Sequence, residues 1–154
     1  MFFNEELPHI VCCGGGGLLA GVCGAVKQVR PTCRVVGVEP ENSNTMQQSL
    51  QAGQPVRDNS ASSVAAGLAP PFAGANCFRH VREFCDGVLT LSDQEIIQTT
   101  RLAYSNGLVV EPSGAAALAA FLNQRIERKE TEKTVVIVLT GGNVAPEELL
   151  SFSK

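Results

Sequence analysis

Short apolar runs alternate with longer segments of helical composition along the whole chain. The apolar runs are rich in Val, Ile, Leu and Cys, a composition typical of strands that are buried on both faces of a parallel sheet. They cover residues 9–13, 34–38, 86–91 and 134–139. The segments of helical composition cover residues 18–29, 43–52, 77–84, 92–105 and 115–128. Strands that alternate with helices predict an α/β fold, a parallel sheet with helices on its faces.

Local signals mark where several of these elements begin or end. Pro31 closely follows the first helical segment, which is a common signal for the end of a helix. Ser92 and Glu95 have the spacing of a capping box at a helix start. Residues 54–76 are rich in Pro, Gly, Ser, Ala and Asn, and we expect a long ordered loop there, of the kind that lines binding sites. A short strand is expected at 108–110.

Length and composition narrow the class of protein. With 154 residues, of which 44% are hydrophobic, we expect a single domain over residues 1–154. The apolar runs are too short to cross a bilayer, and the first residues carry no export signal. A net charge of −3 with scattered basic residues argues against a nucleic-acid surface. Six cysteines without a C-x-x-C pair favour reduced thiols and a cytoplasmic location, and residues 127–133 are expected to be solvated.

Four consecutive glycines follow the first apolar run. Gly14, Gly15, Gly16 and Gly17 carry no Cβ, so the chain can curl there and direct several N–H groups to one anion. The helix that follows points the positive end of its dipole at the same spot. The pattern favours a phosphate cradle over its alternative, a tight turn between strand and helix that binds nothing.

Polar or glycine-rich segments also follow other apolar runs. Ligands bind at the carboxyl ends of parallel strands, so we expect these segments to share a pocket for an anionic small molecule. Thr140 ends the last strand, where its hydroxyl either meets a ring nitrogen or caps the next turn. Glu111 either holds charge near the site or favours the dipole of the following helix. Glu39 and the oxygens of residues 42–45 suit either a hard cation or a helix-capping loop.

Together, these segments resemble the fold-type II pyridoxal-phosphate enzymes, in the branch of serine/threonine dehydratases (ammonia-lyases) and serine racemase. The matching stretches are residues 11–21, 36–40, 109–118 and 135–144. They occur in the order and spacing of that family and span nearly the whole chain. The resemblance implies a partial doubly wound parallel sheet with helices on both faces, as in the large domain of such enzymes. It also implies pyridoxal 5'-phosphate as the cofactor and an amino acid as the substrate.

The resemblance assigns roles to individual residues. In such enzymes the glycine loop binds the cofactor phosphate. The resemblance therefore implies that the four glycines and the adjacent Leu18 bind the cofactor here. A Ser or Thr at the end of the last strand meets the pyridine nitrogen, which implies Thr140. The acid before the Pro-Ser-Gly turn lies near the cofactor, which makes Glu111 a pocket residue.

Two positions depart from the family pattern. The divalent-cation site (Mg or Ca) of racemase-like members maps to Glu39, Ser43 and Thr45. Thr45 replaces an Asp there, so one anionic ligand is lost. In the stretch at 64–68, Ala66 stands where an acid is common.

The largest departure concerns the lysine that carries the cofactor in this family. Its usual Ser-x-Lys setting, the loop that holds the substrate carboxylate and the smaller domain have no counterpart, and the lysines at 27, 129, 133 and 154 lie in other contexts. The chain therefore resembles only the carboxy-terminal half of such an enzyme and lacks the Schiff-base lysine segment. The family reaction is deamination of L-serine or L-threonine to a 2-oxo acid, or racemisation, and we expect this chain to be inactive alone.

Two other functions are consistent with these features. The chain could be a non-catalytic module that binds the cofactor, forms a homo-oligomer or associates with a full-length relative, because missing partner elements leave sheet edges exposed. A dinucleotide-binding site is favoured by Glu39, although Leu19 breaks the required glycine spacing. Exposed apolar surface is also expected to make the chain marginally stable or prone to aggregation.

Overall fold

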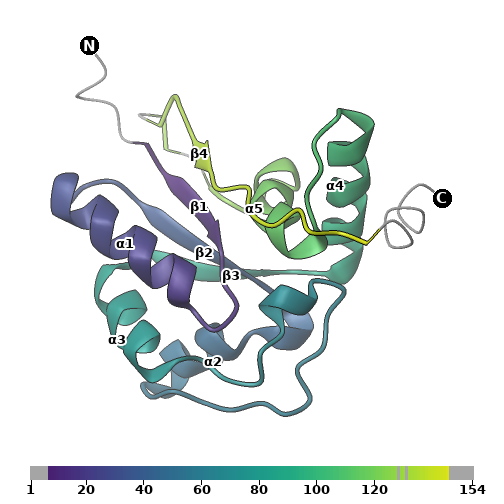
Figure 1. Ribbon diagram of the computed structural model, residues 1–154. Coiled ribbons are helices and arrows are strands. Elements are labelled where there is room, and N and C mark those ends of the chain that lie inside the picture. The colour runs from purple at the N-terminus through teal and green to yellow at the C-terminus, as the bar shows by residue number, and fades with distance from the viewer. Residues whose placement is uncertain (1–6, 128, 131, 146–154) are drawn as a thin grey trace.

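The strands form one parallel sheet. The structure is a computed structural model that describes residues 7–127, 129–130 and 132–145. Its strands are β1 (His9–Cys12), β2 (Val35–Pro40), β3 (Gly87–Leu91) and β4 (Val136–Ile137), in the order β3-β2-β1-β4 (Figure 1). Ile10 of β1 pairs with Val36 on one side and with Ile137 on the other, and every pairing is parallel. The predicted α/β fold is confirmed.

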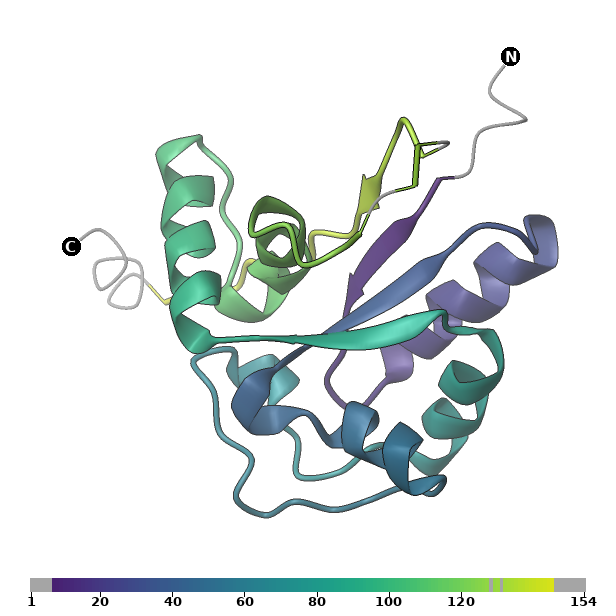
Figure 2. The ribbon, with the colours of Figure 1, turned by 180° about the vertical axis from the view of Figure 1, so that it is seen from behind.

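Helices cover both faces of this sheet (Figures 1 and 2). The described helices and turns are α1 (Gly17–Val29), η1 (Glu41–Ser43), α2 (Thr45–Ala52), η2 (Ala66–Leu68), α3 (Ala75–Phe84), α4 (Asp93–Ser105) and α5 (Pro112–Leu122). α1 and α3 pack together on one face, and α4 and α5 pack together on the other. None of the described helices has the length and apolar character needed to span a membrane.

Alternate residues at the end of β1 point into two different cores. Ile10 and Cys12 belong to the core beneath α5, whereas Val11 and Cys13 belong to the core beneath α1 and α3. All four side chains are at most 4% exposed, as expected for a strand that is covered on both faces. On the α5 side the core is completed by buried alanines, whose short side chains let the helix lie close to the sheet.

The capping box predicted at the start of α4 is present. The Ser92 hydroxyl accepts the Glu95 N–H at 3.3 Å, and the Glu95 carboxylate accepts the Ser92 N–H at 2.9 Å. The Arg125 guanidinium lies 2.8 Å from the same carboxylate and, with the Ser92 hydrogen bonds, lowers the pKa of Glu95. At the end of α2, Gly53 adopts a φ of 70°, so this glycine stops the helix as predicted.

Three predicted elements differ from the structure. Residues 108–110 form no strand because no described strand pairs with them. The last helix begins at Pro112 and ends at Leu122, earlier than predicted at both ends, because proline suits the first turn and Gln124 has a φ of 54°. The strand predicted at 134–139 is reduced to the two residues of β4, since only His9 and Ile10 of β1 pair with it among the described residues.

The segment at 127–133 is not solvated throughout, because it contains a buried acid. Glu132 is 1% exposed, and its carboxylate accepts two hydrogen bonds from the Arg34 guanidinium at 2.6 and 2.7 Å and one from the Lys129 N–H at 3.0 Å. Burial alone would raise the pKa of Glu132, but these hydrogen bonds together hold it below its ordinary value. Arg34 directly precedes β2, so the ion pair ties the segment before β4 to the sheet.

Candidate functional site

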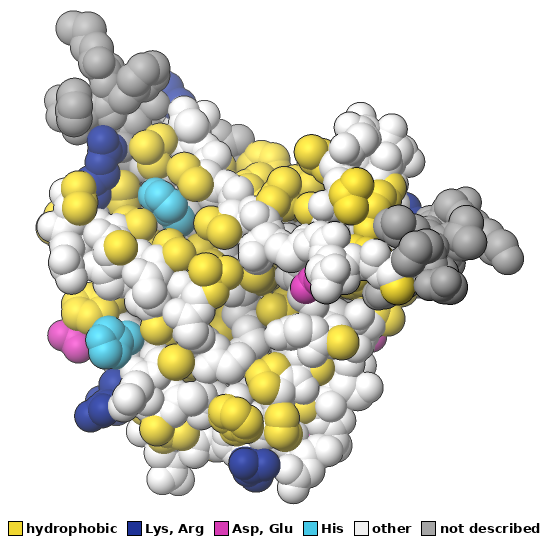
Figure 3. Space-filling view, viewed as in Figure 1, with side chains coloured by type: hydrophobic (Ala, Val, Ile, Leu, Met, Phe, Trp, Pro, Cys, Tyr) yellow, Lys and Arg dark blue, Asp and Glu magenta, His cyan; other side chains and the backbone are white. Residues whose placement is uncertain are grey.

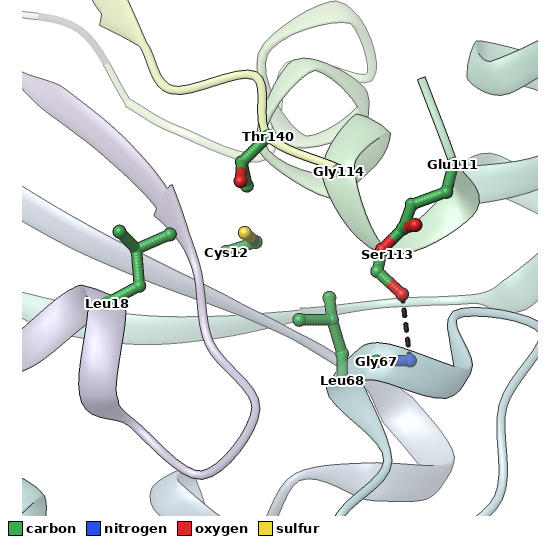
Figure 4. A pocket seen from close by; sticks show the side chains of 8 residues that line it. All are labelled: Cys12, Leu18, Gly67, Leu68, Glu111, Ser113, Gly114 and Thr140. Atoms are coloured by element: carbon green, nitrogen blue, oxygen red, sulfur yellow. Dashed lines mark hydrogen bonds between the residues drawn. The ribbon is translucent and has the colours of Figure 1, made fainter. Parts of the chain in front are cut away.

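Segments that are far apart in the sequence surround a pocket at the carboxyl end of β1, where ligands bind in sheets of this kind. The pocket has a volume of about 200 Å³. Its lining residues are Cys12, Leu18, Gly67, Leu68, Glu111, Ser113, Gly114 and Thr140 (Figure 4). Leu18, Glu111 and Thr140, which the sequence singles out, are thus brought together.

The glycine loop joins β1 to α1 between two lining residues of the pocket, Cys12 and Leu18. Gly14, Gly15, Gly16 and Gly17, which the sequence also singles out, are themselves not among the residues that line it. Gly16 has a φ of 92°, and a Cβ placed on it would lie 2.4 Å from the Met46 Cε, so only glycine fits there. A Cβ on Gly14 would lie 2.8 Å from the backbone oxygen of Gly67, so the loop touches the opposite wall. No side chain caps α1, its first turn carries no acid, and the space beside Gly17 is open. The helix therefore presents bare N–H groups next to Leu18.

Thr140 lies opposite the glycine loop, three residues beyond β4. Its side chain is exposed rather than at the end of a buried strand, because β4 is a short edge strand. Figure 4 shows the Thr140 hydroxyl pointing into the same space as the Cys12 thiol. A Cβ on Gly114 would lie 1.4 Å from the Thr140 carbonyl oxygen, so the first turn of α5 is in direct backbone contact with Thr140.

The position of Glu111 is compatible with both of the roles that the sequence left open. It occupies the N-cap position of α5, and it also lines the pocket. Its N–H donates to the Gly141 carbonyl at 3.1 Å, and a Cβ on Gly141 would lie 2.6 Å from the Glu111 carboxyl carbon. Burial raises the pKa of the Cys12 thiol to about 11, so the floor of the pocket is uncharged at neutral pH. Glu111 is the acidic residue among the described lining residues.

Sequence reasoning missed several lining residues, although most lie in segments that it quoted. Cys12 looked like any other core cysteine, and only its place at the end of β1 marks it. Gly67 and Leu68 belong to the long loop that was expected to line a site. Ser113 stands in the block after Glu111, and nothing in the sequence alone indicates that its hydroxyl accepts the Gly67 N–H at 2.9 Å.

Of the three residues considered for a divalent cation, Glu39 caps a helix, and none of the three is among the residues that line the pocket. The two oxygens of the Glu39 carboxylate accept the Met46 and Gln47 N–H groups, each at 2.9 Å, at the start of α2. The Ser43 hydroxyl donates to the Leu68 carbonyl at 3.0 Å, and Thr45 is buried at the first position of α2. Burial raises the pKa of Glu39 to about 7. Over the described residues, no group of three or more His, Cys, Asp or Glu side chains could hold a metal ion.

Comparison with known proteins agrees with this geometry. Residues 5–141 match the family model described as "Pyridoxal-phosphate dependent enzyme". The chain belongs to this family. Serine racemase of Schizosaccharomyces pombe is 37% identical over 143 residues, which are 92% of this chain and 44% of that protein. The catabolic L-threonine dehydratase of Escherichia coli strain K12 is 34% identical over 136 residues, which are 88% of this chain and 41% of that protein.

Solved structures of family members have the same fold. The crystal structure of serine racemase from Dictyostelium discoideum superposes with a TM-score of 0.82 at 34% identity, covering 93% of this chain and 45% of that one. The resemblance to serine racemase and threonine dehydratases, and to part of their length, is thus confirmed. The chain spans less than half the length of the curated relatives that it matches here.

Proposed function

We propose that the pocket between α1 and α5 holds pyridoxal 5'-phosphate, and that the chain forms part of a serine/threonine ammonia-lyase or a racemase. The observation that carries this proposal is the meeting of a bare helix N-terminus and the Thr140 hydroxyl at one pocket. When bound, this cofactor supplies an electron sink for reactions at the α-carbon of an amino acid. Membership of the family supports the cofactor, and the names of the relatives support the substrate class.

The residues of this chain divide the work of holding the cofactor. The N–H groups of residues 14–18 would donate to the phosphate, and the dipole of α1 would favour its negative charge. The Thr140 hydroxyl can either donate to or accept from a ring nitrogen, so it suits a pyridine without forcing a charge on it. Cys12 and Leu68 exclude water from the floor, because they are only 4% and 5% exposed. Glu111 adds a carboxylate on the side where α5 begins.

We further propose that the chain alone binds the cofactor without turning over L-serine or L-threonine. The described lining residues include no lysine, which the family chemistry requires as the anchoring amine. Lys27 lies elsewhere, 2.9 Å from the Asp86 carboxylate on the α1 side of the sheet. Robust formation of a 2-oxo acid by the purified chain with cofactor and L-serine or L-threonine would refute this part.

A pair of glycine substitutions tests the phosphate cradle. Gly17→Asp places a carboxylate in open space at the start of α1, where it favours the helix dipole but repels a phosphate. Gly21→Asp is the matched control, because Gly21 also faces open space but lies one turn further into the helix. We expect Gly17→Asp to weaken binding of pyridoxal phosphate at least tenfold, measured by absorbance titration, with no loss of thermal stability. Equal affinity of both variants for pyridoxal phosphate would refute the proposal that the glycine loop binds the phosphate.

The second candidate is a non-catalytic module that associates with another subunit, either a second copy or a full-length relative. It is favoured by apolar side chains near the pocket, since Leu18 is 44% exposed and Leu139 is 39% exposed. Figure 3 shows hydrophobic side chains spread over the face that contains the pocket, with charged ones mainly toward its rim. Size-exclusion chromatography with light scattering, with and without a full-length relative, tests this, and a strictly monomeric chain argues against it.

We also propose a cytoplasmic location, which the free state of all six cysteines supports.

A further inference from the structure

One wall of the pocket is a very short element. Gly67 and Leu68 of η2 face the lining residues of α5. A 3₁₀ turn of three residues has few hydrogen bonds of its own, here Leu68 N–H to the Ala65 carbonyl at 2.8 Å and Ala69 N–H to the Ala66 carbonyl at 3.1 Å. Its position must therefore be set by contacts from outside the turn.

Two buried serine hydroxyls hold this wall from two different elements, α5 and η1. Ser113, the second residue of α5, is 7% exposed, and its Oγ accepts the Gly67 N–H at 2.9 Å. Ser43, the last residue of η1, is 1% exposed, and its Oγ donates to the Leu68 carbonyl at 3.0 Å. Figure 4 shows the Ser113 bond crossing from α5 to η2 beside the pocket.

The η2 wall also packs closely against Ser113 and the glycine loop. A Cβ on Gly67 would lie 2.9 Å from the Ser113 Oγ, so the missing side chain is what allows this hydrogen bond. On the other side, a Cβ on Gly14 would lie 3.2 Å from the Leu68 Cα. The wall is thus held between the glycine loop and the start of α5.

The approach to the wall is also tied down. The Asp93 carboxylate accepts the Ser63 hydroxyl at 2.5 Å and the Val64 N–H at 3.2 Å, and the Ser63 Oγ accepts the Ala65 N–H at 3.0 Å. Asp93 is the first residue of α4. Hydrogen bonds therefore attach residues 63–65 to α4, whereas other hydrogen bonds attach Gly67 to α5 and Leu68 to η1.

We propose that Ser113 and Ser43 are positioning residues that fix the place of the η2 wall relative to α5 and η1, and so the width of the cofactor pocket that Gly67 and Leu68 line. This inference rests on the proposed function, because the ligand that senses the width is pyridoxal phosphate. Ser43 is not among the lining residues of the pocket and acts through the Leu68 carbonyl. Ser113 does line the pocket, but its hydroxyl is bound to the Gly67 N–H, so exchange of that N–H reports the positioning role separately from any contact with the cofactor.

The test compares Ser113→Ala with a buried serine elsewhere. Ser49 is 0% exposed and accepts the Val56 N–H at 3.0 Å, so Ser49→Ala also removes an acceptor from a backbone N–H, but away from the pocket. Both variants are expected to lower the melting temperature. Only Ser113→Ala is expected to weaken pyridoxal phosphate binding, about three- to tenfold, as for the loss of one hydrogen bond. Ser113→Thr keeps the hydroxyl and should retain the wild-type dissociation constant.

Amide hydrogen exchange supplies a readout that needs no cofactor. Loss of the Ser113 hydroxyl should speed exchange of the Gly67 N–H in the free chain, and Ser49→Ala should not. Ser43→Ala is the second variant if Ser113→Ala does not fold, because it releases Leu68 and leaves Ser113 in place.

The outcomes separate this inference from the proposed function. Wild-type affinity in Ser113→Ala, or equally weak binding by Ser113→Thr, overturns the positioning role. A wild-type chain that binds no pyridoxal phosphate overturns the proposed function, and Gly67 exchange then decides the inference alone. In that case unchanged exchange in Ser113→Ala means that the hydroxyl does not hold the wall.

Discussion

β1 and β4 are neighbours in the sheet, yet they support their ends of the pocket in different ways. β1 has a partner strand on each side, and Ile10, Val11 and Cys12 are at most 4% exposed. Among the described strands, β4 pairs with β1 alone, over two half-buried residues, and the chain beyond it is exposed at Leu139 and Thr140.

This difference shows what determines the geometry of each side. On the β1 side, Gly16 is fixed by dense packing against Met46 and Cys77, so the fold itself sets the shape of the glycine loop. On the β4 side, Thr140 is located mainly by backbone contacts with Gly114 and by the hydrogen bond between Glu111 and Gly141. A side chain added at Gly16 should therefore cost mainly stability, and a shift of Thr140 should be felt mainly in binding.

Gly16→Ala should have the largest effect on stability. The new methyl group would adopt a left-handed backbone and overlap the Met46 Cε, so we expect a loss of about 4 kcal/mol in the free energy of unfolding. Gly17→Ala is the control, because its methyl group meets open space and should stabilise by up to about 1 kcal/mol. Urea unfolding measures both, and equal stabilities would mean that the loop is not tightly packed.

Arg34→Met tests how firmly the segment before β4 is attached. Removing the guanidinium takes two charge-assisted hydrogen bonds from the buried Glu132 carboxylate, so we expect a loss of about 3 kcal/mol. Arg125→Met is the control, since Arg125 is 47% exposed in its pair with Glu95 and should cost less than about 1 kcal/mol. Urea unfolding at neutral pH distinguishes the two. Similar losses in both variants would show that the Glu132 pair has no special role.

The stability of the β2 end should depend on pH through Glu39. Its pKa is raised to about 7 in the folded chain, so its stabilising contribution is complete below the unfolded value near 4.5 and is lost as the pH rises through 7. Between pH 5 and pH 8 the wild type should lose about 2 kcal/mol more than Glu39→Gln does. Urea unfolding at both pH values measures this difference. Parallel pH profiles of the two proteins would exclude this ionisation as the cause.

Gly114→Ala should have a clearer effect on binding than on stability. Its methyl group would overlap the Thr140 carbonyl, so the backbone at Thr140 must move away from α5. We expect a loss of about 2 kcal/mol in the free energy of unfolding, because a backbone shift is needed, partly offset by the helix preference of alanine. Pyridoxal phosphate affinity should fall at least tenfold by absorbance titration. Unchanged affinity would mean that the position of Thr140 does not matter for binding.

The difference between β1 and β4 also explains which parts of the fold could be predicted from the sequence. β1, the glycine loop and the capping box at Ser92 follow from local patterns, because their residues interact with near neighbours in the chain. β4 was predicted too long, since the extent of an edge strand depends on which strand lies beside it. Residues 108–110 have the composition of a strand but lack a partner among the described strands.

The site was predictable in part for a similar reason. Leu18, Glu111 and Thr140 could be grouped because segments after parallel strands lie at one edge of the sheet. Ser113 and Gly67 could not, because their hydrogen bond joins residues 46 positions apart and depends on how closely α5 approaches η2. Glu39 suited two interpretations, and the N–H groups of Met46 and Gln47 determine that it caps a helix.

The pairing of Ile10 with Ile137 has a consequence for biosynthesis. One edge of β1 stays without its partner until residue 137 has been translated, a wait of about 6 to 25 seconds at ordinary elongation rates. During that interval the nascent polypeptide presents an apolar, unpaired strand to other chains on the same messenger RNA. Chaperone binding near the ribosome, rather than the stability of the finished sheet, would then limit the yield of soluble protein.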